Sequence, residues 1–271
     1  EKRLYTCSRF FYGKNMYNRL YVFGCSFTMY KWPTWADYLH AGGLAENYSN
    51  WALPGGSNDF ILHSFTECIS THNITDKDIV CIMWSQPHRI SDYTDQEGWT
   101  MPGNAYLYQP KERAKYLHED KIALENRSYF RAVATILESI GCDFYFTSME
   151  RIELKYDEVF DTQKYFKPSM AEFLGYTSAA DDTWRETMPG DRHPSPSEHA
   201  KFAKSMFDID NSKVDTLCLD AEKHIFEDEK PWHRHYIYMP EKIPNRLPLT
   251  PGKYNTGSGV LANVAGLRTK S

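Results

Sequence analysis

The chain lacks an excess of positive charge, long apolar runs and paired cysteines. Its 271 residues carry a formal net charge of −5, which gives no basic field to attract nucleic acid or an anionic membrane surface. No apolar run approaches the length that spans a membrane. The six cysteines are dispersed without a CxxC pair, so we expect reduced thiols that pack as small apolar side chains. Neither nucleic acid nor a membrane is expected as a partner.

Targeting and metal-binding patterns are missing as well. The first residues, EKRLYTCSRFFYGKN, do not have the pattern of a signal peptide. We therefore expect synthesis in a cytoplasm, and the protein could act elsewhere as part of an assembly such as a virion. The segment HIFEDEKPWHRHY holds three histidines, but their spacing matches no structural zinc or metalloprotease motif (His224, His233 and His235). No metal site is expected.

Strand-like and helix-like segments alternate through most of the chain. Short apolar runs predict strands over 19–24, 45–53, 76–85 and 142–149. Helical spacing of apolar residues predicts helices over 34–43, 57–72, 120–141 and 195–207. Ser57 is expected as the N-cap of the second helix and Gly141 as the C-cap of the third. This alternation favours an α/β fold, with a mostly parallel sheet covered by helices on both faces.

Three regions do not follow this alternation. A polar, aromatic-rich loop is expected over 86–117 and an irregular insertion over 151–189. After 207 the pattern weakens, and Pro, Gly and Asn accumulate. We therefore expect one α/β domain over 1–207, with an irregular extension over 208–271 that packs on the domain or on a partner. His199 is expected on the exposed face of the helix over 195–207.

The segment YVFGCSFT ends an apolar run in a glycine and a small hydroxyl residue. Parallel sheets bind their ligands at the carboxyl ends of the strands, where this segment would place Ser26. The serine could be a nucleophile, or it could be the cap of the next helix. Cys25 beside it is expected to be a packed small residue, since no pattern puts a base next to its thiol.

A serine nucleophile needs a base, a group that orients the base, and donors for an oxyanion. The segment GDRHPSPSEHAKFAK places His193 just before a helix, with Asp191 two residues earlier. A carboxylate near a histidine can hold its Nδ1–H and leave Nε2 to accept a proton. In NWALPGG a strand ends in Pro-Gly-Gly ahead of a helix, where unpaired backbone N–H groups could hold an oxyanion.

These three segments together resemble the conserved blocks of the SGNH (GDSL-type) hydrolases. FGCSFT resembles the Gly-Asp-Ser block with Cys25 at the usual Asp position, and NWALPGG resembles the second block, with Asn50 five residues before Gly55. DRHP resembles the last block, which carries the catalytic Asp and His. The resemblance covers roughly 20–207. It implies a flavodoxin-like three-layer α/β/α sandwich and a Ser-His-Asp triad of Ser26, His193 and Asp191, without a cofactor.

The sequence departs from the family pattern at two places. The third block usually supplies an Asn side chain to the oxyanion hole, whereas here MWSQPHR puts Gln86 nearest to that position. Glutamine has the same amide donor on a longer side chain, so we expect Gln86 to join Gly55 in the oxyanion hole. The last block usually has two residues between Asp and His, and here it has one. Either Asp191 or one of two earlier residues, Asp181 and Asp182, would therefore orient the histidine.

The expected function is that of a serine esterase that acts on small ester groups, with O-acetyl groups of a carbohydrate as the preferred substrate. The alternative is a weakly active or inactive binding or assembly module of the same fold, for example a virion component that contacts host glycans. The aromatics of the loop over 86–117 could stack on sugar rings, or they could anchor the loop to the domain (Tyr93, Trp99, Tyr106 and Tyr108).

Overall fold

The centre of the protein is a parallel sheet of four strands in the order β2-β1-β3-β6. The computed structural model describes residues 16–30, 32–94, 98–105, 117–152, 168–176 and 193–227. The strands of the sheet are β1 (Tyr17–Phe23), β2 (Ala45–Asn50), β3 (Ile79–Trp84) and β6 (Asp143–Ser148). Each overlaps a segment predicted as a strand, so these four predictions and the parallel sheet are confirmed.

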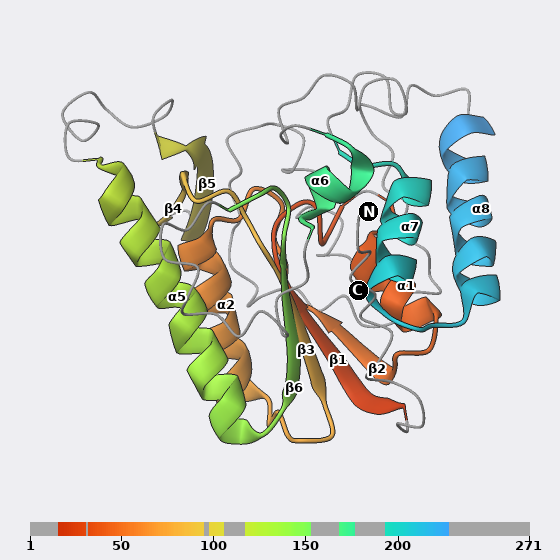
Figure 1. Ribbon diagram of the computed structural model, residues 1–271, viewed down its shortest axis with the longest axis horizontal. Coiled ribbons are helices and arrows are strands. Elements are labelled where there is room, and N and C mark those ends of the chain that lie inside the picture. Colours follow the sequence, from red (N-terminus) through yellow and green to blue (C-terminus); the bar gives the residue numbers. More distant parts are fainter. Residues whose placement is uncertain are drawn as a thin grey trace, which may run out of the picture.

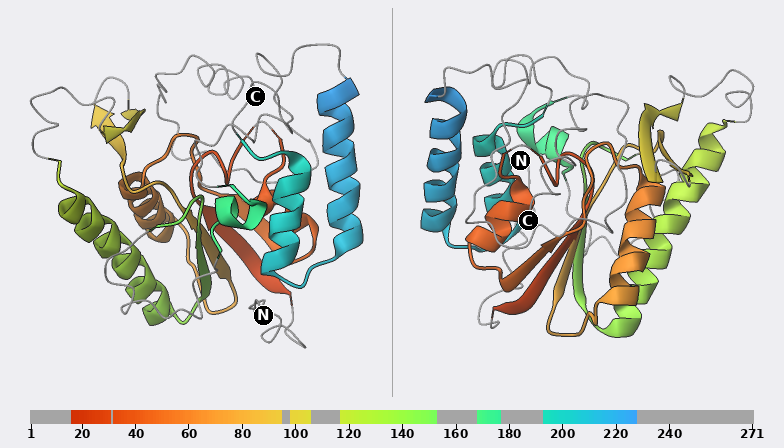
Figure 2. Two further views of the ribbon diagram at one scale, coloured as in Figure 1. Left: turned by 45° about the horizontal axis from the view of Figure 1, so that its top comes forward. Right: turned by 180° about the vertical axis from the view of Figure 1, so that it is seen from behind.

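Helices cover both faces of this sheet (Figures 1 and 2). On one face lie α2 (Asn58–Thr71) and α5 (Glu119–Ile140). On the other face lie α1 (Trp35–Ala41), α7 (Pro196–Met206) and α8 (Asn211–Glu227). The predicted caps are confirmed, because the Ser57 side chain accepts the N–H of Phe60 and Gly141 adopts the left-handed conformation at φ 76°.

The side chains of the central strands alternate between the two faces, as the pleat of a strand requires. One set packs under α1, α7 and α8 (Leu20, Val22, Ile79, Cys81 and Met83). The other set packs under α2 and α5 (Tyr21, Phe23, Val80, Ile82 and Trp84). Because both faces are covered, β3 and the second half of β1 (Leu20–Phe23) are buried at every position, which explains their continuous apolar runs.

The segment predicted as one loop over 86–117 contains a β-hairpin, which the sequence pattern does not indicate. Its antiparallel strands are β4 (Arg89–Thr94) and β5 (Gly98–Asn104). Trp99 from β5 packs against Phe60 and His63 of α2, with ring centroids 5.3 and 5.2 Å apart. Trp99 therefore anchors the hairpin to the domain, as the second interpretation of the loop aromatics expected. Tyr93 is 65% exposed, and Tyr106 and Tyr108 lie outside the described residues.

The region after 207 is not irregular where the structure describes it, so that expectation is wrong for Asn211–Glu227. This segment forms α8, which packs back on the domain by burying Val214, Cys218 and Ala221. Two of these side chains, Val214 and Cys218, belong to the same core as β1 and α7. The described part of the insertion over 151–189 includes a further short helix, α6 (Met170–Leu174), whose Phe173 contacts Phe202 of α7.

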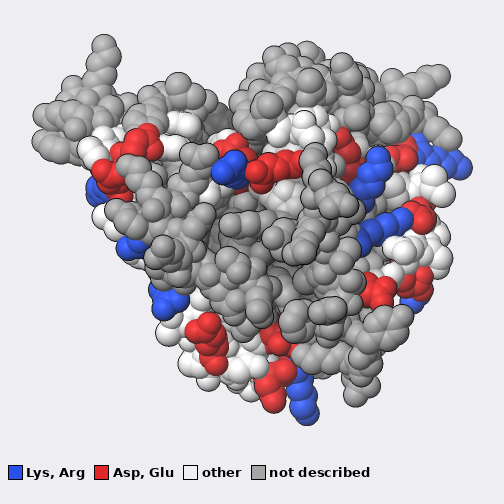
Figure 3. All heavy atoms as spheres, in the orientation of Figure 1, with Lys and Arg blue, Asp and Glu red and all other residues white. Residues whose placement is uncertain are grey.

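On the face drawn in Figure 3, the described residues form no broad region of one charge. In Figure 3, the Lys and Arg side chains lie scattered among Asp and Glu over the described part of the face that is drawn. Among the described helices, none is both long enough and apolar enough to span a membrane. The five described cysteines are free and buried, as expected for thiols that pack as apolar side chains.

Replacing Gly24 with alanine should destabilise the fold, because Gly24 lies where β1 meets the next turn. A Cβ there would lie 2.1 Å from Thr28 Oγ1, 2.8 Å from Thr28 Cβ and 3.1 Å from the Met83 carbonyl oxygen. We expect Gly24→Ala to lower the free energy of unfolding by about 1–3 kcal/mol, the usual cost of an added methyl group in a packed site. Urea denaturation measures this change.

A double-mutant cycle with Thr28→Ala tests the cause of that loss. The Thr28 hydroxyl is buried without a hydrogen-bond partner in the described structure, so removing it sacrifices no hydrogen bond. The double variant should lose less stability than the two single variants added together, because the closest clash is gone. Strictly additive losses would show that the Thr28 contact is not the reason for glycine at this position.

Candidate active site

Three of the predicted site residues lie at one edge of the sheet. Ser26 follows β1, Gly55 follows β2 and Gln86 follows β3. These three strands are neighbours and run parallel, so their carboxyl ends meet at the same edge. The strand order reverses direction at β1, since β2 and β3 lie on opposite sides of it. Such a switch point is where open α/β sheets bind their ligands.

The turn after β1 holds Ser26 in a nearly enclosed position. The Cys25 carbonyl accepts hydrogen bonds from the N–H groups of Thr28 and Met29, at 2.9 and 3.1 Å. The Thr28 carbonyl in turn accepts the Asn50 side-chain amide at 2.9 Å. The Ser26 residue is 5% exposed, and its backbone N–H makes no hydrogen bond within the described residues. Cys25 is fully buried beside Met149, which confirms its expected role as a packed residue.

Gly55 occupies the second corner of a tight turn. Pro54 is the first corner, and the Gly56 N–H closes the turn on the Leu53 carbonyl at 2.9 Å. The φ angle of Gly55 is +85°, which a type II turn requires at this position and glycine adopts without strain. The Leu53 N–H donates to the Gly24 carbonyl at 3.2 Å, so the turn is tied to the end of β1. The Gly55 N–H has no partner among the described residues.

Two buried asparagines hold the backbone on both sides of Gln86. Asn58 accepts the Ser85 N–H at 2.7 Å and donates to the Ser85 carbonyl at 3.0 Å. It also donates to the Asn126 side-chain oxygen at 2.6 Å. Asn126 donates to the Pro87 carbonyl at 3.2 Å. Gln86 is half-buried between these anchored residues, and its amide makes no hydrogen bond within the described structure.

His193 lies against the turn that carries Ser26. Its ring stacks on Tyr30 with centroids 3.7 Å apart and planes 21° apart, and it contacts Phe27 at 5.7 Å. The Trp32 indole N–H donates to the Pro194 carbonyl at 2.9 Å, which fixes the chain at the start of α7. Phe27 directly follows Ser26, so the structure brings the predicted base and the predicted nucleophile to the same turn.

The hydrogen bond between the predicted base and nucleophile is not formed. Among the described residues, the Ser26 hydroxyl makes no hydrogen bond to His193. Catalytic hydrogen bonds are often long in structures without substrate and tighten when substrate binds. The proposed carboxylate partners of His193 all lie outside the described residues (Asp181, Asp182 and Asp191). His193 and Ser26 therefore stay predictions, and so does the triad carboxylate.

His199 was expected on an exposed helix face, and this prediction is wrong. The side chain is fully buried, and its Nδ1 accepts the Trp35 N–H at 3.3 Å. An Nδ1 that accepts a hydrogen bond leaves the proton on Nε2, which is buried without a partner in the described structure. Burial, and then the neighbouring His193, hold the pKa of His199 well below its usual value. His199 is therefore a neutral imidazole near His193, the predicted base.

The described residues include no metal-binding cluster. No three His, Cys, Asp or Glu side chains within them are grouped so as to hold a metal ion. Of the three histidines considered above for a metal, His233 and His235 lie outside the described residues. The described edge of the sheet brings together the Ser26 hydroxyl and the His193 imidazole. It also holds three N–H donors without a partner among the described residues, from Ser26, Gly55 and Gln86.

A scan of protein-family models finds no match to this chain, and a search of curated proteins finds none either.

The buried His199 should make the fold sensitive to acid. Folding lowers the pKa of His199, so below pH about 6.5 the unfolded chain binds a proton there that the folded chain does not bind. Unfolding therefore becomes more favourable as the pH falls. We expect His199→Gln, which keeps an acceptor for Trp35, to remove this dependence. Between pH about 6.5 and 5 the wild type should lose up to about 1.4 kcal/mol per pH unit more than the variant. Urea denaturation across this range measures both slopes, and equal slopes would contradict a neutral buried His199.

Proposed function

We propose that this protein is a serine esterase related to the SGNH (GDSL-type) hydrolases, which removes small acyl groups such as O-acetyl groups of a carbohydrate. The observation that carries the proposal is the gathering of Ser26, Gly55 and Gln86 at one edge, with His193 packed on the Ser26 turn. The strand order β2-β1-β3-β6 supports the flavodoxin-like sandwich of that family, since such sheets begin with the order 2-1-3-4 when the hairpin is left aside.

In the proposed reaction, Ser26 Oγ attacks the ester carbonyl while the His193 Nε2 accepts the serine proton. The carbonyl oxygen becomes an oxyanion, and the alcohol leaves with the proton that His193 returns to it. Water then attacks the acyl-enzyme through the same histidine and releases the acid. An acidic residue before His193, of which Asp191 is the nearest, would hold the other ring nitrogen.

The three unpaired donors support an oxyanion hole. The backbone N–H groups of Ser26 and Gly55 and the Gln86 amide come from the ends of three adjacent strands, and none is hydrogen-bonded within the described residues. Donors left unpaired at a site must be satisfied by water or by a ligand. An oxyanion is the ligand that such a set of donors stabilises best, because it can accept several hydrogen bonds at once.

A second candidate function is a glycan-binding or assembly module with little or no catalysis. One observation favours it, namely that the Ser26 hydroxyl makes no hydrogen bond to His193 within the described structure. In such a protein the edge of the sheet would bind a ligand without activating the serine. The two candidates differ in whether ester hydrolysis depends on Ser26.

Hydrolysis of p-nitrophenyl acetate tests the esterase proposal. We expect turnover by the wild type and loss of at least about 10³-fold in kcat/KM for Ser26→Ala and for His193→Ala, because each removes a reacting group. Ser128→Ala is the matched control, since this exposed serine of α5 donates only to the Leu124 carbonyl. Absence of turnover in the folded wild type, or full activity in Ser26→Ala, would reject the esterase and leave the binding module.

Gln86→Ala tests the third oxyanion donor separately. Loss of one donor from an oxyanion hole costs about 10²–10³ in kcat, with little change in KM, because the donor acts mainly in the transition state. Asn73→Ala serves as the control, since it removes an exposed amide before the start of β3, at the opposite end of that strand from Gln86. An unchanged kcat in Gln86→Ala would mean that this amide does not face the reacting carbonyl.

A further inference from the structure

A cavity lined by both polar and apolar residues lies beside the loop that holds Gln86. Its volume is about 160 Å³, and its walls come from the start of α2, the strand β4 and the first half of α5. Pro87 and both buried asparagines of the Gln86 support, Asn58 and Asn126, line it. Two residues of the cavity wall therefore also make the hydrogen bonds that hold the backbone on both sides of Gln86.

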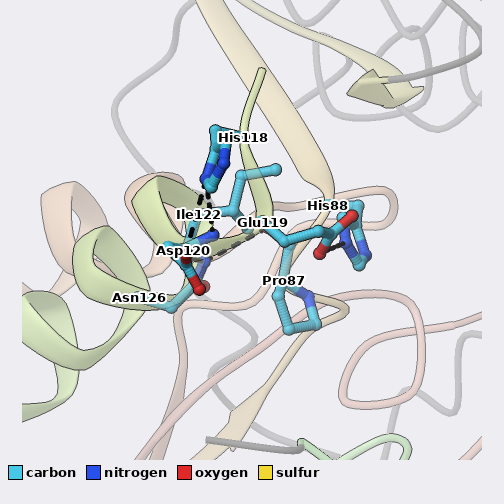
Figure 4. Close-up of polar contacts among 7 residues, drawn as sticks. All are labelled: Pro87, His88, His118, Glu119, Asp120, Ile122 and Asn126. Carbon is cyan, nitrogen blue, oxygen red and sulfur yellow. Dashed lines mark hydrogen bonds and ion pairs between the residues drawn. The ribbon is translucent and has the colours of Figure 1, made fainter. Parts of the chain in front are cut away.

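One wall of the cavity is fixed by further polar contacts, which Figure 4 shows. His88 Nε2 lies 2.9 Å from the Glu119 carboxylate at the start of α5. Asn126 donates to the Ile122 carbonyl at 2.7 Å as well as to Pro87. These contacts join the loop after β3 to α5, so this wall is built before a ligand enters.

Three carboxylates and one guanidinium line the cavity. Asp59, Asp92 and Glu125 line it together with Arg89. Within the described residues, Arg89 makes no ion pair with these carboxylates, and its Nη1 is buried without a hydrogen-bond partner. Burial raises the pKa of the Asp59 carboxyl, although a hydrogen bond from Ser57 opposes this effect. An unpaired buried donor is costly, so a ligand or water must satisfy Arg89.

The mixture of charges decides which ligand fits. An anion would pair with Arg89 but would be repelled by three carboxylates. A cation would be attracted by the carboxylates but could not accept a hydrogen bond from Arg89, whose Nη1 would stay without a partner. A hydroxyl group both donates and accepts, so a molecule with several hydroxyls can donate to the carboxylates and accept from Arg89. The Tyr129 ring in the same wall offers an apolar face for the C–H groups of such a molecule.

The volume also fits one ring of this kind. An apolar cavity of about 150 Å³ holds a benzene ring, so about 160 Å³ accepts a single six-membered ring. We propose that this cavity binds one sugar ring of a carbohydrate ligand, with Arg89 and Asp59 as its main hydrogen-bonding partners. That the bound sugar belongs to the ester substrate rests on the proposed esterase function, whereas the binding itself does not require Ser26.

Saturation-transfer NMR with glucose, galactose, xylose and N-acetylglucosamine tests the cavity. Acetate, phosphate and spermidine serve as anionic and cationic probes. We expect at least one sugar to bind the wild type and Ser26→Ala equally. Its affinity should fall about tenfold or more in Arg89→Met and in Asp59→Asn, since each change removes a hydrogen bond to a charged group. Arg131→Met, which replaces an exposed arginine of α5 outside the cavity, should bind as the wild type does.

Three outcomes would overturn the proposal. They are no sugar binding to the folded wild type, sugar binding that neither Arg89→Met nor Asp59→Asn weakens, and binding of only the charged probes. Circular dichroism shows whether each variant is folded. If either Arg89→Met or Asp59→Asn does not fold, the other variant tests the cavity. Sugar binding without ester hydrolysis would reject the esterase but keep the cavity site. Ester hydrolysis without sugar binding would keep the esterase but reject the cavity site.

Discussion

The hydrogen bonds that continue beyond the end of β1 hold the segments on which the candidate site depends. The Trp51 N–H donates to the Val22 carbonyl at 2.8 Å, and the Leu53 N–H donates to the Gly24 carbonyl at 3.2 Å. These bonds extend the parallel pairing of β1 and β2 into the Gly55 turn. Gly24 has no side chain, so Thr28 can pack against it and the chain can turn at once into Ser26. The close approach of β1, β2 and β3 thus sets the distances at the edge of the sheet.

Buried amide side chains form hydrogen bonds with the backbone where the regular hydrogen bonding between strands stops. Backbone groups at the ends of strands lose their neighbours and need other partners. Asn50 binds the turn after β1, and Asn58 with Asn126 binds the loop after β3. An amide side chain offers donors and an acceptor without a charge, so it can pair with a backbone N–H and a carbonyl in a buried place. The catalytic and sugar-binding proposals both depend on this support, because Gln86 and the cavity share it.

The sequence predicted the framework of the fold well, because β3 and the second half of β1 are buried on both faces and form unbroken apolar runs. It also predicted the residues at the strand ends, since the position after a parallel strand is informative in itself. The hairpin was missed because β5 contains two glycines and a proline, which do not resemble a strand. The apolar positions of α8, at Val214, Leu217 and Ala221, have helical spacing and were overlooked.

The position of His199 could also have been predicted. It lies three residues before Phe202 and four before Ala203, so it shares their buried helix face. By contrast, no local pattern indicates the bond between Asn58 and Asn126, which joins residues 68 positions apart. The same is true of the Trp32 bond to Pro194, which spans 162 positions. Such contacts follow from the packing of whole elements, so one sequence alone does not reveal them.

Labelling with a fluorophosphonate probe, followed by peptide mass spectrometry, tests whether His193 activates Ser26. The probe reacts with a serine that a neighbouring base activates. We expect one adduct on the wild type, on the peptide that contains Ser26, and none on His193→Ala. A folded protein that forms no adduct, or one that forms its adduct on another residue, would contradict the claim that the Ser26 turn and His193 form an active site.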